Sequence, residues 1–153
     1  MLTEQALELY HDHDPHWSAD LVVALERVRP GLALEWATEC AKALVDNVTL
    51  SGEKKKQLNW LDELAHSKTA TDWSSLMDKS NQIWHEERDL IHTAIAHLYA
   101  ALAHLLQNNS PRYRMFVMWA VNVMGDHDFY RQTSLAIPLA LFERFVTAST
   151  TAT

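Results

Sequence analysis

Apolar residues recur along this chain at the three- and four-residue spacing of a helix face, and the period-two alternation of strands is rare. The clearest stripe lies in 32–47, where apolar residues share one face and charged residues share the opposite face. This pattern predicts an all-α fold, and it directs the thiol of Cys40 toward the core, where a structural role is expected. The apolar members of the stripe are Ala33, Ala37, Cys40, Ala41, Leu44 and Val48.

The same spacing predicts a single-domain bundle of about six helices that spans residues 1–153. Helices are expected over 3–11, 18–29, 32–47 and 51–67. A long helix is expected near 82–107, and an almost wholly apolar helix near 111–124 would occupy the centre of the bundle. The final helix is expected to begin at residue 126 or 128 and to kink at Pro138, and the tail 148–153 is expected to fray.

Composition indicates the cellular compartment in which the protein is expected. The chain has a single cysteine, so an internal disulfide and a multi-cysteine metal site are both excluded. No uninterrupted apolar run approaches the roughly 18 residues of a membrane span. Residues 1–14 carry four acidic side chains where a signal peptide needs basic and then apolar residues. We therefore expect a protein of the reducing cytoplasm that does not associate with membranes.

Charge points to the kind of partner. Acidic residues outnumber basic residues by 20 to 13, which gives a formal net charge of -7. Such a chain is repelled by phosphate backbones, so nucleic acid is disfavoured as a partner and a basic protein is favoured. Most of the negative charge, -6, lies within residues 1–50. The expected landing area for a basic partner consists of the carboxylates of Asp12, Asp14, Glu35, Glu39 and Asp46.

Six tryptophans are many for a chain of 153 residues. Trp119 lies in the apolar segment 111–124 and is expected in the core. Trp36 and Trp60 each lie about 100° from the apolar centre of their helix, which suits either a groove between helices or a contact with another chain. Because tryptophan is enriched among binding hot spots, both residues join the predicted partner-binding set.

Histidines near carboxylates raise the question of a metal site. A cluster at 11–16 has suitable ligand types in a predicted loop. The pairs Glu63-x-x-His66 and Asp89-x-x-His92 have the spacing of di-metal helical bundles, but their wheel positions place them away from the apolar faces. We therefore assign no metal ligand, no cofactor and no catalytic residue, although a histidine–carboxylate metal-binding enzyme or sensor remains an alternative hypothesis. His97 and His104 are expected to be half-buried and hydrogen-bonded to neighbouring helices.

One segment resembles a known family. Leu32–Val45 carries a W-A-x-x-C-A motif at Trp36, Cys40 and Ala41, and it resembles a helix of all-helical immunity proteins from bacterial polymorphic toxin systems. The alanine- and histidine-containing segment His92–His104 is similar to later helices of that family. The resemblance implies a non-enzymatic cytoplasmic protein that binds and neutralises a cognate toxin, and the charge favours a basic toxin. A helical homo-oligomeric adaptor that pairs through the seam of 82–107 is a further alternative.

Overall fold

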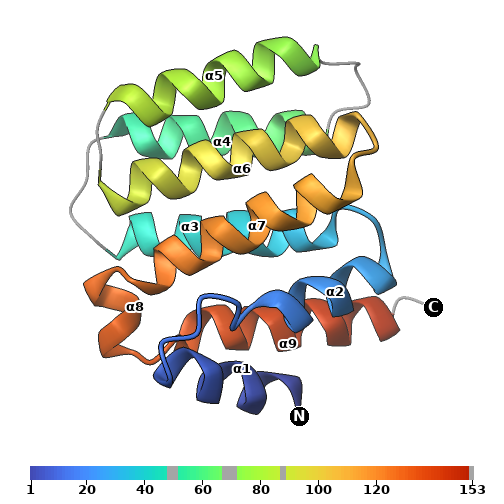
Figure 1. Ribbon diagram of the computed structural model, residues 1–153, viewed down its shortest axis with the longest axis vertical. Helices are drawn as coiled ribbons and strands as arrows, with labels where there is room; N and C mark the ends of the chain where they lie inside the picture. The colour runs from blue at the N-terminus through green and yellow to red at the C-terminus, as the bar shows by residue number, and fades with distance from the viewer. Residues whose placement is uncertain (48–51, 67–71, 87–88, 152–153) are drawn as a thin grey trace.

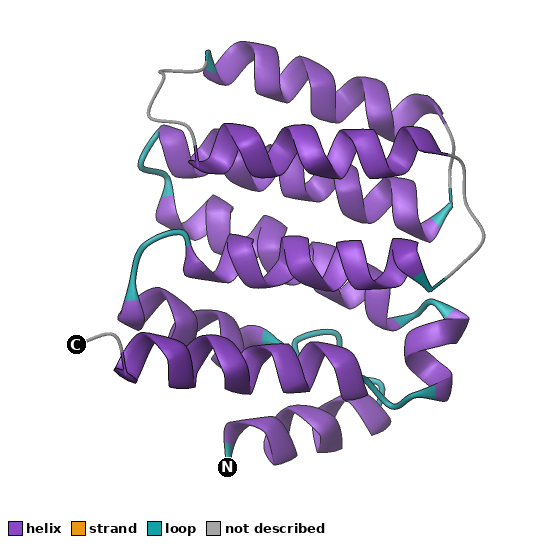
Figure 2. Cartoon of the chain, turned by 180° about the vertical axis from the view of Figure 1, so that it is seen from behind, coloured by secondary structure: helices purple, strands orange, loops and turns teal. Residues whose placement is uncertain are grey.

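Helices make up the fold. The computed structural model describes residues 1–47, 52–66, 72–86 and 89–151, and these residues form nine helices and no strand (Figure 1, Figure 2). The predicted all-α class is confirmed, whereas the predicted number of about six helices is wrong. The helices are α1 (Leu2–His11), α2 (Ala19–Val28), α3 (Leu32–Asp46), α4 (Gly52–His66), α5 (Trp73–Glu86), α6 (Leu90–Leu106), α7 (Ser110–Gly125), α8 (Asp128–Gln132) and α9 (Ala136–Thr151).

The helices are stacked in tiers. In Figure 1, α4, α5 and α6 form the upper part, α3 and α7 the middle, and α1, α2, α8 and α9 the lower part. α6 packs most extensively against α5 and α7, while α3 contacts α2, α4, α6, α7 and α9. Because they are surrounded in this way, α3 and α6 bury most of their side chains. None of the described helices combines the length and the apolar character that a membrane crossing needs.

The predicted long helix over 82–107 is wrong, because the chain reverses between Glu86 and Leu90 (Figure 1). α6 begins there with Asp89 as its N-cap residue. The Asp89 carboxylate accepts a hydrogen bond from the His92 backbone N–H at 2.7 Å and pairs with Lys54 Nζ at 2.9 Å. Most of the apolar seam of α6 packs against other helices of the same chain, and its last member, Leu105, is half-buried. Its buried members are Ile91, Ile95, Leu98 and Leu102.

Replacing Asp89 with alanine is expected to lower the free energy of unfolding by about 1–2 kcal/mol, because α6 loses its N-cap. Urea unfolding followed by circular dichroism measures this loss. The matched variant Asp89→Ser keeps a capping oxygen but loses the ion pair with Lys54, so it should recover most of the stability. An Asp89→Ser variant as unstable as Asp89→Ala would show that the ion pair, and not the cap, dominates.

The contribution of Asp89 should also depend on pH. Partial burial raises its pKa, but the hydrogen bond from His92 and the Lys54 ammonium together hold the pKa of Asp89 well below its usual value. A carboxyl group with a lowered folded-state pKa stabilises the protein above its unfolded-state pKa of about 4, and this stability is lost as the pH falls. The difference in unfolding free energy between the protein and Asp89→Ala should therefore shrink on acidification below about pH 4.

α7 spans the segment that the sequence predicts at the centre of the bundle. In the structure, one face of α7 is exposed to solvent. Trp119, predicted in the core, is 39% exposed, and Met115 and Met118 are half-buried. In Figure 1, α7 lies at the front with no described helix over that side. The core prediction for Trp119 fails because this residue lies seven positions after Arg112 and three before Asn122, so it shares their polar stripe.

Two helices replace the single kinked helix that is predicted at the C-terminus. α8 ends at Gln132 and α9 begins at Ala136, so Pro138 stands in the first turn of α9. Proline causes no kink there, because first-turn N–H groups have no acceptor within the helix. The tail predicted to fray from residue 148 continues α9 to Thr151, and residues 152 and 153 lie outside the described residues.

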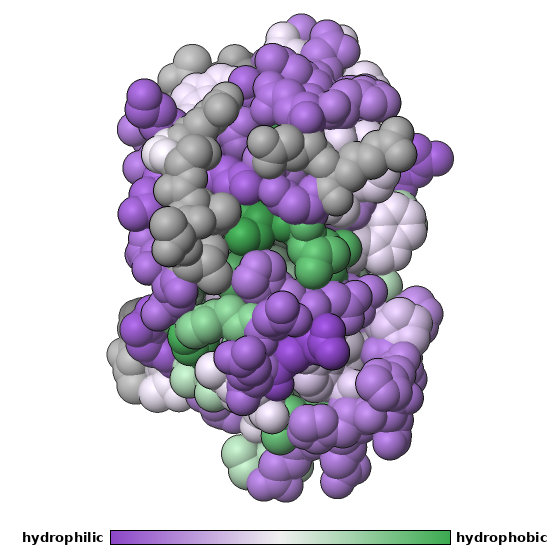
Figure 3. Space-filling model, turned by 90° about the vertical axis from the view of Figure 1, so that its left-hand side faces the viewer, coloured by the Kyte–Doolittle hydropathy of each residue, from purple (hydrophilic) through white to green (hydrophobic). Residues whose placement is uncertain are grey.

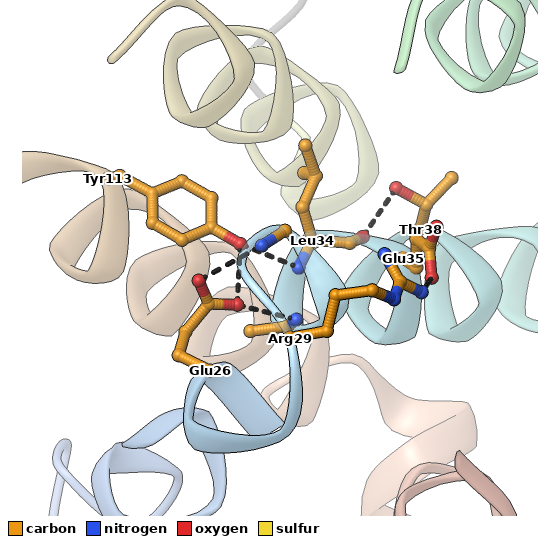
Figure 4. A network of polar contacts seen from close by, with 8 residues as sticks. Glu26, Arg29, Leu34, Glu35, Thr38 and Tyr113 are labelled. Carbon is orange, nitrogen blue, oxygen red and sulfur yellow. Dashed lines mark hydrogen bonds and ion pairs between the residues drawn. The ribbon is translucent and has the colours of Figure 1, made fainter. Parts of the chain in front are cut away.

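A polar network secures the turn between α2 and α3 (Figure 4). α3 begins after Gly31, whose φ of 90° favours glycine and which has no side chain to cap the helix. The Glu26 carboxylate takes that role and accepts hydrogen bonds from the N–H groups of Gly31 and Ala33 at 3.1 and 2.9 Å. Tyr113 of α7 donates its hydroxyl to Glu26 at 2.9 Å and accepts from the Leu34 N–H at 3.1 Å. The network thus joins α2, α3 and α7.

Candidate functional site

The structure corrects one of the predicted partner-binding residues, Trp36. Its side chain is 0% exposed. The indole Nε1–H donates a hydrogen bond to the Pro138 carbonyl at 2.9 Å, and the ring packs edge-on against Phe142 with centroids 6.2 Å apart. The sequence allows Trp36 to lie either in a groove between helices or at a contact with another chain. The structure places it in a groove between helices. Because α9 covers it, Trp36 does not reach a partner.

The five predicted carboxylates do not form one unopposed acidic surface. Asp12 and Asp14 lie in the turn after α1, and no ion pair in the described part of the chain involves either of them. The other three lie along α3 beside cations of the same chain. Among the five predicted carboxylates, those without an ion pair in the described part of the chain therefore lie at the end of α1. The pairs along α3 are Arg29–Glu35 at 2.5 Å, Lys42–Glu39 at 3.5 Å and Lys55–Asp46 at 3.8 Å.

Trp60 of α4 is 43% exposed. Its ring lies 5.6 Å from the Tyr99 ring, and Lys79 Nζ lies 5.8 Å from its centroid. Part of the indole is thus used in contacts within the protein, and the remainder is open to solvent. Trp60 stays a candidate contact for a partner.

An exposed aromatic surface that the sequence pattern does not predict spans α5, α6 and α7. Trp84 of α5 and Trp119 of α7 are 43% and 39% exposed. Both rings lie against His97 of α6, with centroids 5.5 and 5.8 Å away. Phe116 lies 5.8 Å from His97 and 5.4 Å from Trp119. We call these four residues the aromatic face. Arg112 and Asn122 share a stripe of α7 with Trp119, and these polar neighbours are the sequence signal that could have predicted its exposure.

The aromatic contacts continue along α6 to His104. Phe116 stacks on His104 with centroids 5.3 Å apart and planes 6° apart, and Trp73 meets the same imidazole edge-on. Burial lowers the pKa of His97 to about 4, and burial, with a smaller effect of the Arg112 charge, lowers the pKa of His104. Both imidazoles are therefore neutral at pH 7 and pack as flat rings. A hydrogen bond to a neighbouring helix is predicted for His104. Its Nδ1, however, has no hydrogen-bond partner among the described residues.

A second apolar feature adjoins the aromatic face on the other side of α7. A cavity of about 360 Å³ between α2 and α7 is lined mainly by Val22, Val23, Met115 and Met118. Unbranched methionine side chains adapt to irregular surfaces, which suits a binding groove. Met115 lies one helical turn before Trp119, so the cavity adjoins the aromatic face on α7.

The histidine–carboxylate pairs do not gather around a common point. His92, predicted on a flank away from the apolar face, is buried, and its Nδ1 lies 3.2 Å from Asp89 Oδ2 within the N-cap of α6. Glu63 is exposed on α4, and the side chain of His66 lies outside the described part of the structure. Across the described residues, no three histidine, cysteine or carboxylate side chains lie close enough together to hold a metal ion.

Comparisons with known proteins add no support to the resemblance to immunity proteins, which depends on the residues of the motif alone. No family model, no curated protein and no solved structure matches the chain. The motif residues Trp36, Cys40 and Ala41 are all buried. Burial raises the pKa of the Cys40 thiol, and the Tyr130 hydroxyl donates a hydrogen bond to the Cys40 carbonyl. The core position predicted for Cys40 is confirmed, and the motif therefore describes how α3 packs rather than a binding surface.

Proposed function

We propose that this protein is a non-enzymatic cytoplasmic inhibitor that binds a basic toxin protein and neutralises it. The observation that carries the proposal is the aromatic face, where Trp84 and Trp119 remain open on either side of His97. Together with the adjoining cavity on α7, this face supplies the apolar centre that protein interfaces need.

Exposed aromatic rings held in place by their neighbours suit recognition. Tryptophan buries a large area on binding and loses little conformational freedom when its ring is already packed. Trp84, Trp119 and Phe116 contact His97 or one another, so these rings are positioned before a partner arrives. The neutral His97 adds no charge that binding would have to desolvate.

The charge of the chain supports a basic partner. A net charge of -7 accelerates encounter with a positively charged protein, and this steering weakens as salt increases. Asp12 and Asp14 contribute to that field without an ion-pair partner in the described part of the chain. Steering and an apolar centre together account for fast and stable association without a catalytic group.

Co-expression with the toxin domain encoded beside this gene tests the proposal. The protein is expected to protect cells from the toxin and to form a complex with it that survives purification. Trp84→Ala and Trp119→Ala are each expected to weaken the complex on the order of 30-fold, as measured by calorimetry, because each removes a central aromatic contact.

Trp60→Ala tests the other candidate contact, because Trp60 is as exposed as Trp84 but lies outside the aromatic face. The matched control is Leu2→Ala, which removes an exposed apolar side chain of α1. It is expected to leave the affinity nearly unchanged. A loss of binding confined to Trp60→Ala would place the interface on α4 and contradict the role of the aromatic face. Absence of both complex and protection would contradict the inhibitor function itself.

A further inference from the structure

A groove runs between α2 and α7, which lie side by side in opposite chain directions (Figure 1). Its cavity of about 360 Å³ is the one that adjoins the aromatic face, and we call it the α2–α7 groove. By contrast, Figure 3 faces the end of the molecule near α8 and shows a mostly hydrophilic surface over the lower helices. An apolar lining is therefore a local property of the groove. Its apolar lining residues are Ala19, Val22, Val23, Pro111, Met115 and Met118.

The groove has one charged group at its edge. Among the described residues that line it, Arg114 of α7 alone carries a charge. Arg114 is exposed and makes no ion pair within the described part of the chain. No aspartate or glutamate occurs in residues 90–125, so α6 and α7 bring no carboxylate to the groove. The guanidinium group is therefore available to an anionic ligand.

The charged residues of α2 give the groove a direction. Tyr113, near the start of α7, donates a hydrogen bond to Glu26, near the end of α2. The Glu26 carboxylate also accepts from two backbone N–H groups, and Arg27 and Arg114 outnumber it at this end. Asp20, near the start of α2, stands at the opposite end of the groove. An anionic group is therefore favoured at the Arg114 end and disfavoured at the other.

The apolar part of the groove is long and narrow. Pro111 and Met118 lie seven residues apart on α7, which corresponds to about 10 Å along the helix axis. An extended alkyl chain of medium length has a similar length. The half-buried side chains of Met115 and Met118 are unbranched, so they adapt to the shape of such a chain. Cavities of roughly 300–1,000 Å³ with an apolar lining and a few polar groups are typical of small-molecule sites.

We infer that the α2–α7 groove binds a free aliphatic carboxylate of medium chain length, with its alkyl chain between α2 and α7 and its carboxylate on Arg114. The guanidinium group donates two parallel hydrogen bonds to a carboxylate, which fixes that end of the ligand. The alkyl chain removes the apolar wall of the groove from water. The inference goes beyond the proposed function, because the ligand is a small molecule and the site needs no toxin.

Titration with octanoate tests this inference, followed by nuclear magnetic resonance of the methionine methyl groups. The signals of Met115 and Met118 are expected to shift and to saturate. We expect a dissociation constant on the order of 1 mM, as suits a ligand of about ten heavy atoms. Met77 of α5 is also half-buried but lies outside the groove, so its signal should stay in place.

Two related ligands separate the contributions of the chain and the charge. Hexanoate buries two fewer CH₂ groups and is expected to bind on the order of 10-fold more weakly than octanoate. Octanamide keeps the chain without the charge and is expected to bind about threefold to tenfold more weakly. These comparisons need no variant, so they remain decisive even if a variant folds poorly.

Arg114→Gln is expected to weaken octanoate binding by about threefold to tenfold and to leave octanamide binding unchanged. A change confined to the charged ligand separates a contact with the carboxylate from a general disturbance of α7. The matched control is Arg144→Gln, which removes an exposed arginine of α9 and is expected to change neither affinity.

Four results would overturn the inference. Octanoate leaves the signals of Met115 and Met118 in place, or it shifts Met77 equally, which indicates non-specific association. Hexanoate or octanamide binds as tightly as octanoate. Arg144→Gln weakens octanoate binding as much as Arg114→Gln does. Because none of the titrations uses a toxin, their failure would leave the proposed inhibitor function standing.

Discussion

At pH 11 three buried tyrosines are together expected to lower the stability of the protein by about 4 kcal/mol relative to neutral pH, because they must stay protonated in the folded state. Burial raises the pKa of Tyr99, Tyr113 and Tyr130 far above the value of about 10 that applies in the unfolded chain. Above about pH 10 the unfolded chain releases three protons that the folded protein retains. Each contributes about 1.4 kcal/mol at pH 11, and the stability falls as the pH rises.

The hydroxyl groups of these tyrosines explain why the folded state prefers the phenol. Tyr99 donates to the Gln57 carbonyl at 2.5 Å, Tyr130 donates to the Cys40 carbonyl, and Tyr113 donates to the Glu26 carboxylate. A phenolate has no proton to donate, and it would face these oxygen atoms without water. Ionisation therefore removes a hydrogen bond and leaves a buried charge.

Urea unfolding at intervals between about pH 8 and pH 11 measures this loss. Tyr99→Phe is the informative variant, because it removes one of the three groups and should reduce the loss of stability at pH 11 by about 1.4 kcal/mol. Tyr10 is half-buried and serves as the matched control, since Tyr10→Phe should change the pH dependence less. A stability that stays constant up to pH 11 would contradict the burial of these hydroxyl groups.

Trp36→Ala is expected to lower the free energy of unfolding by about 3–5 kcal/mol, the cost of removing a large buried aromatic side chain. The indole is fully enclosed, it packs against Phe142, and it donates to the Pro138 carbonyl. Its removal opens a cavity between α3 and α9 and removes the hydrogen bond from the indole to that carbonyl. Since domains of this size are stable by about 5–15 kcal/mol, the variant should unfold at much lower urea concentration.

The control is Trp84→Ala, which removes the same side-chain type from an exposed position. It is expected to cost about 1 kcal/mol or less, because much of the ring is already in contact with water. Equal destabilisation by the two substitutions would contradict the distinction between a core tryptophan on α3 and a surface tryptophan on α5. The comparison also separates stability from binding, since only Trp84 is proposed to contact a toxin.

The helical class and the burial of Cys40 follow from local pattern, whereas the reversal at Asp89 does not. A helical wheel treats 82–107 as continuous, since apolar spacing persists across the break. The reversal depends on Asp89 capping α6 while Lys54, 35 residues earlier, pairs with its carboxylate. The open face of α7 has a similar origin, because an apolar side chain is buried only if another element covers it.

The candidate sites differ in how far the sequence could indicate them. The exposure of Trp119 can be predicted from the polar residues Arg112 and Asn122, which lie on the same face of the helix. The common contact of Trp84 and Trp119 with His97 cannot be predicted in this way, because it requires α5 and α7 to flank α6. The hydrogen bond from Tyr10 to the Gly125 carbonyl cannot be predicted from the sequence either, since it forms only where the ends of α1 and α7 meet.

The order of amino acids by itself determined that the chain is helical, acidic in its first third and equipped with a thiol that faces inward. These properties depend on residue type and on spacing within one helix, so they need no knowledge of the neighbours. Only the tertiary structure decided that Trp36 is enclosed by α9, that Trp84 and Trp119 are open, and where the carboxylates lack ion pairs. Those outcomes depend on contacts between segments far apart in the chain, and local periodicity carries no information about which segments meet.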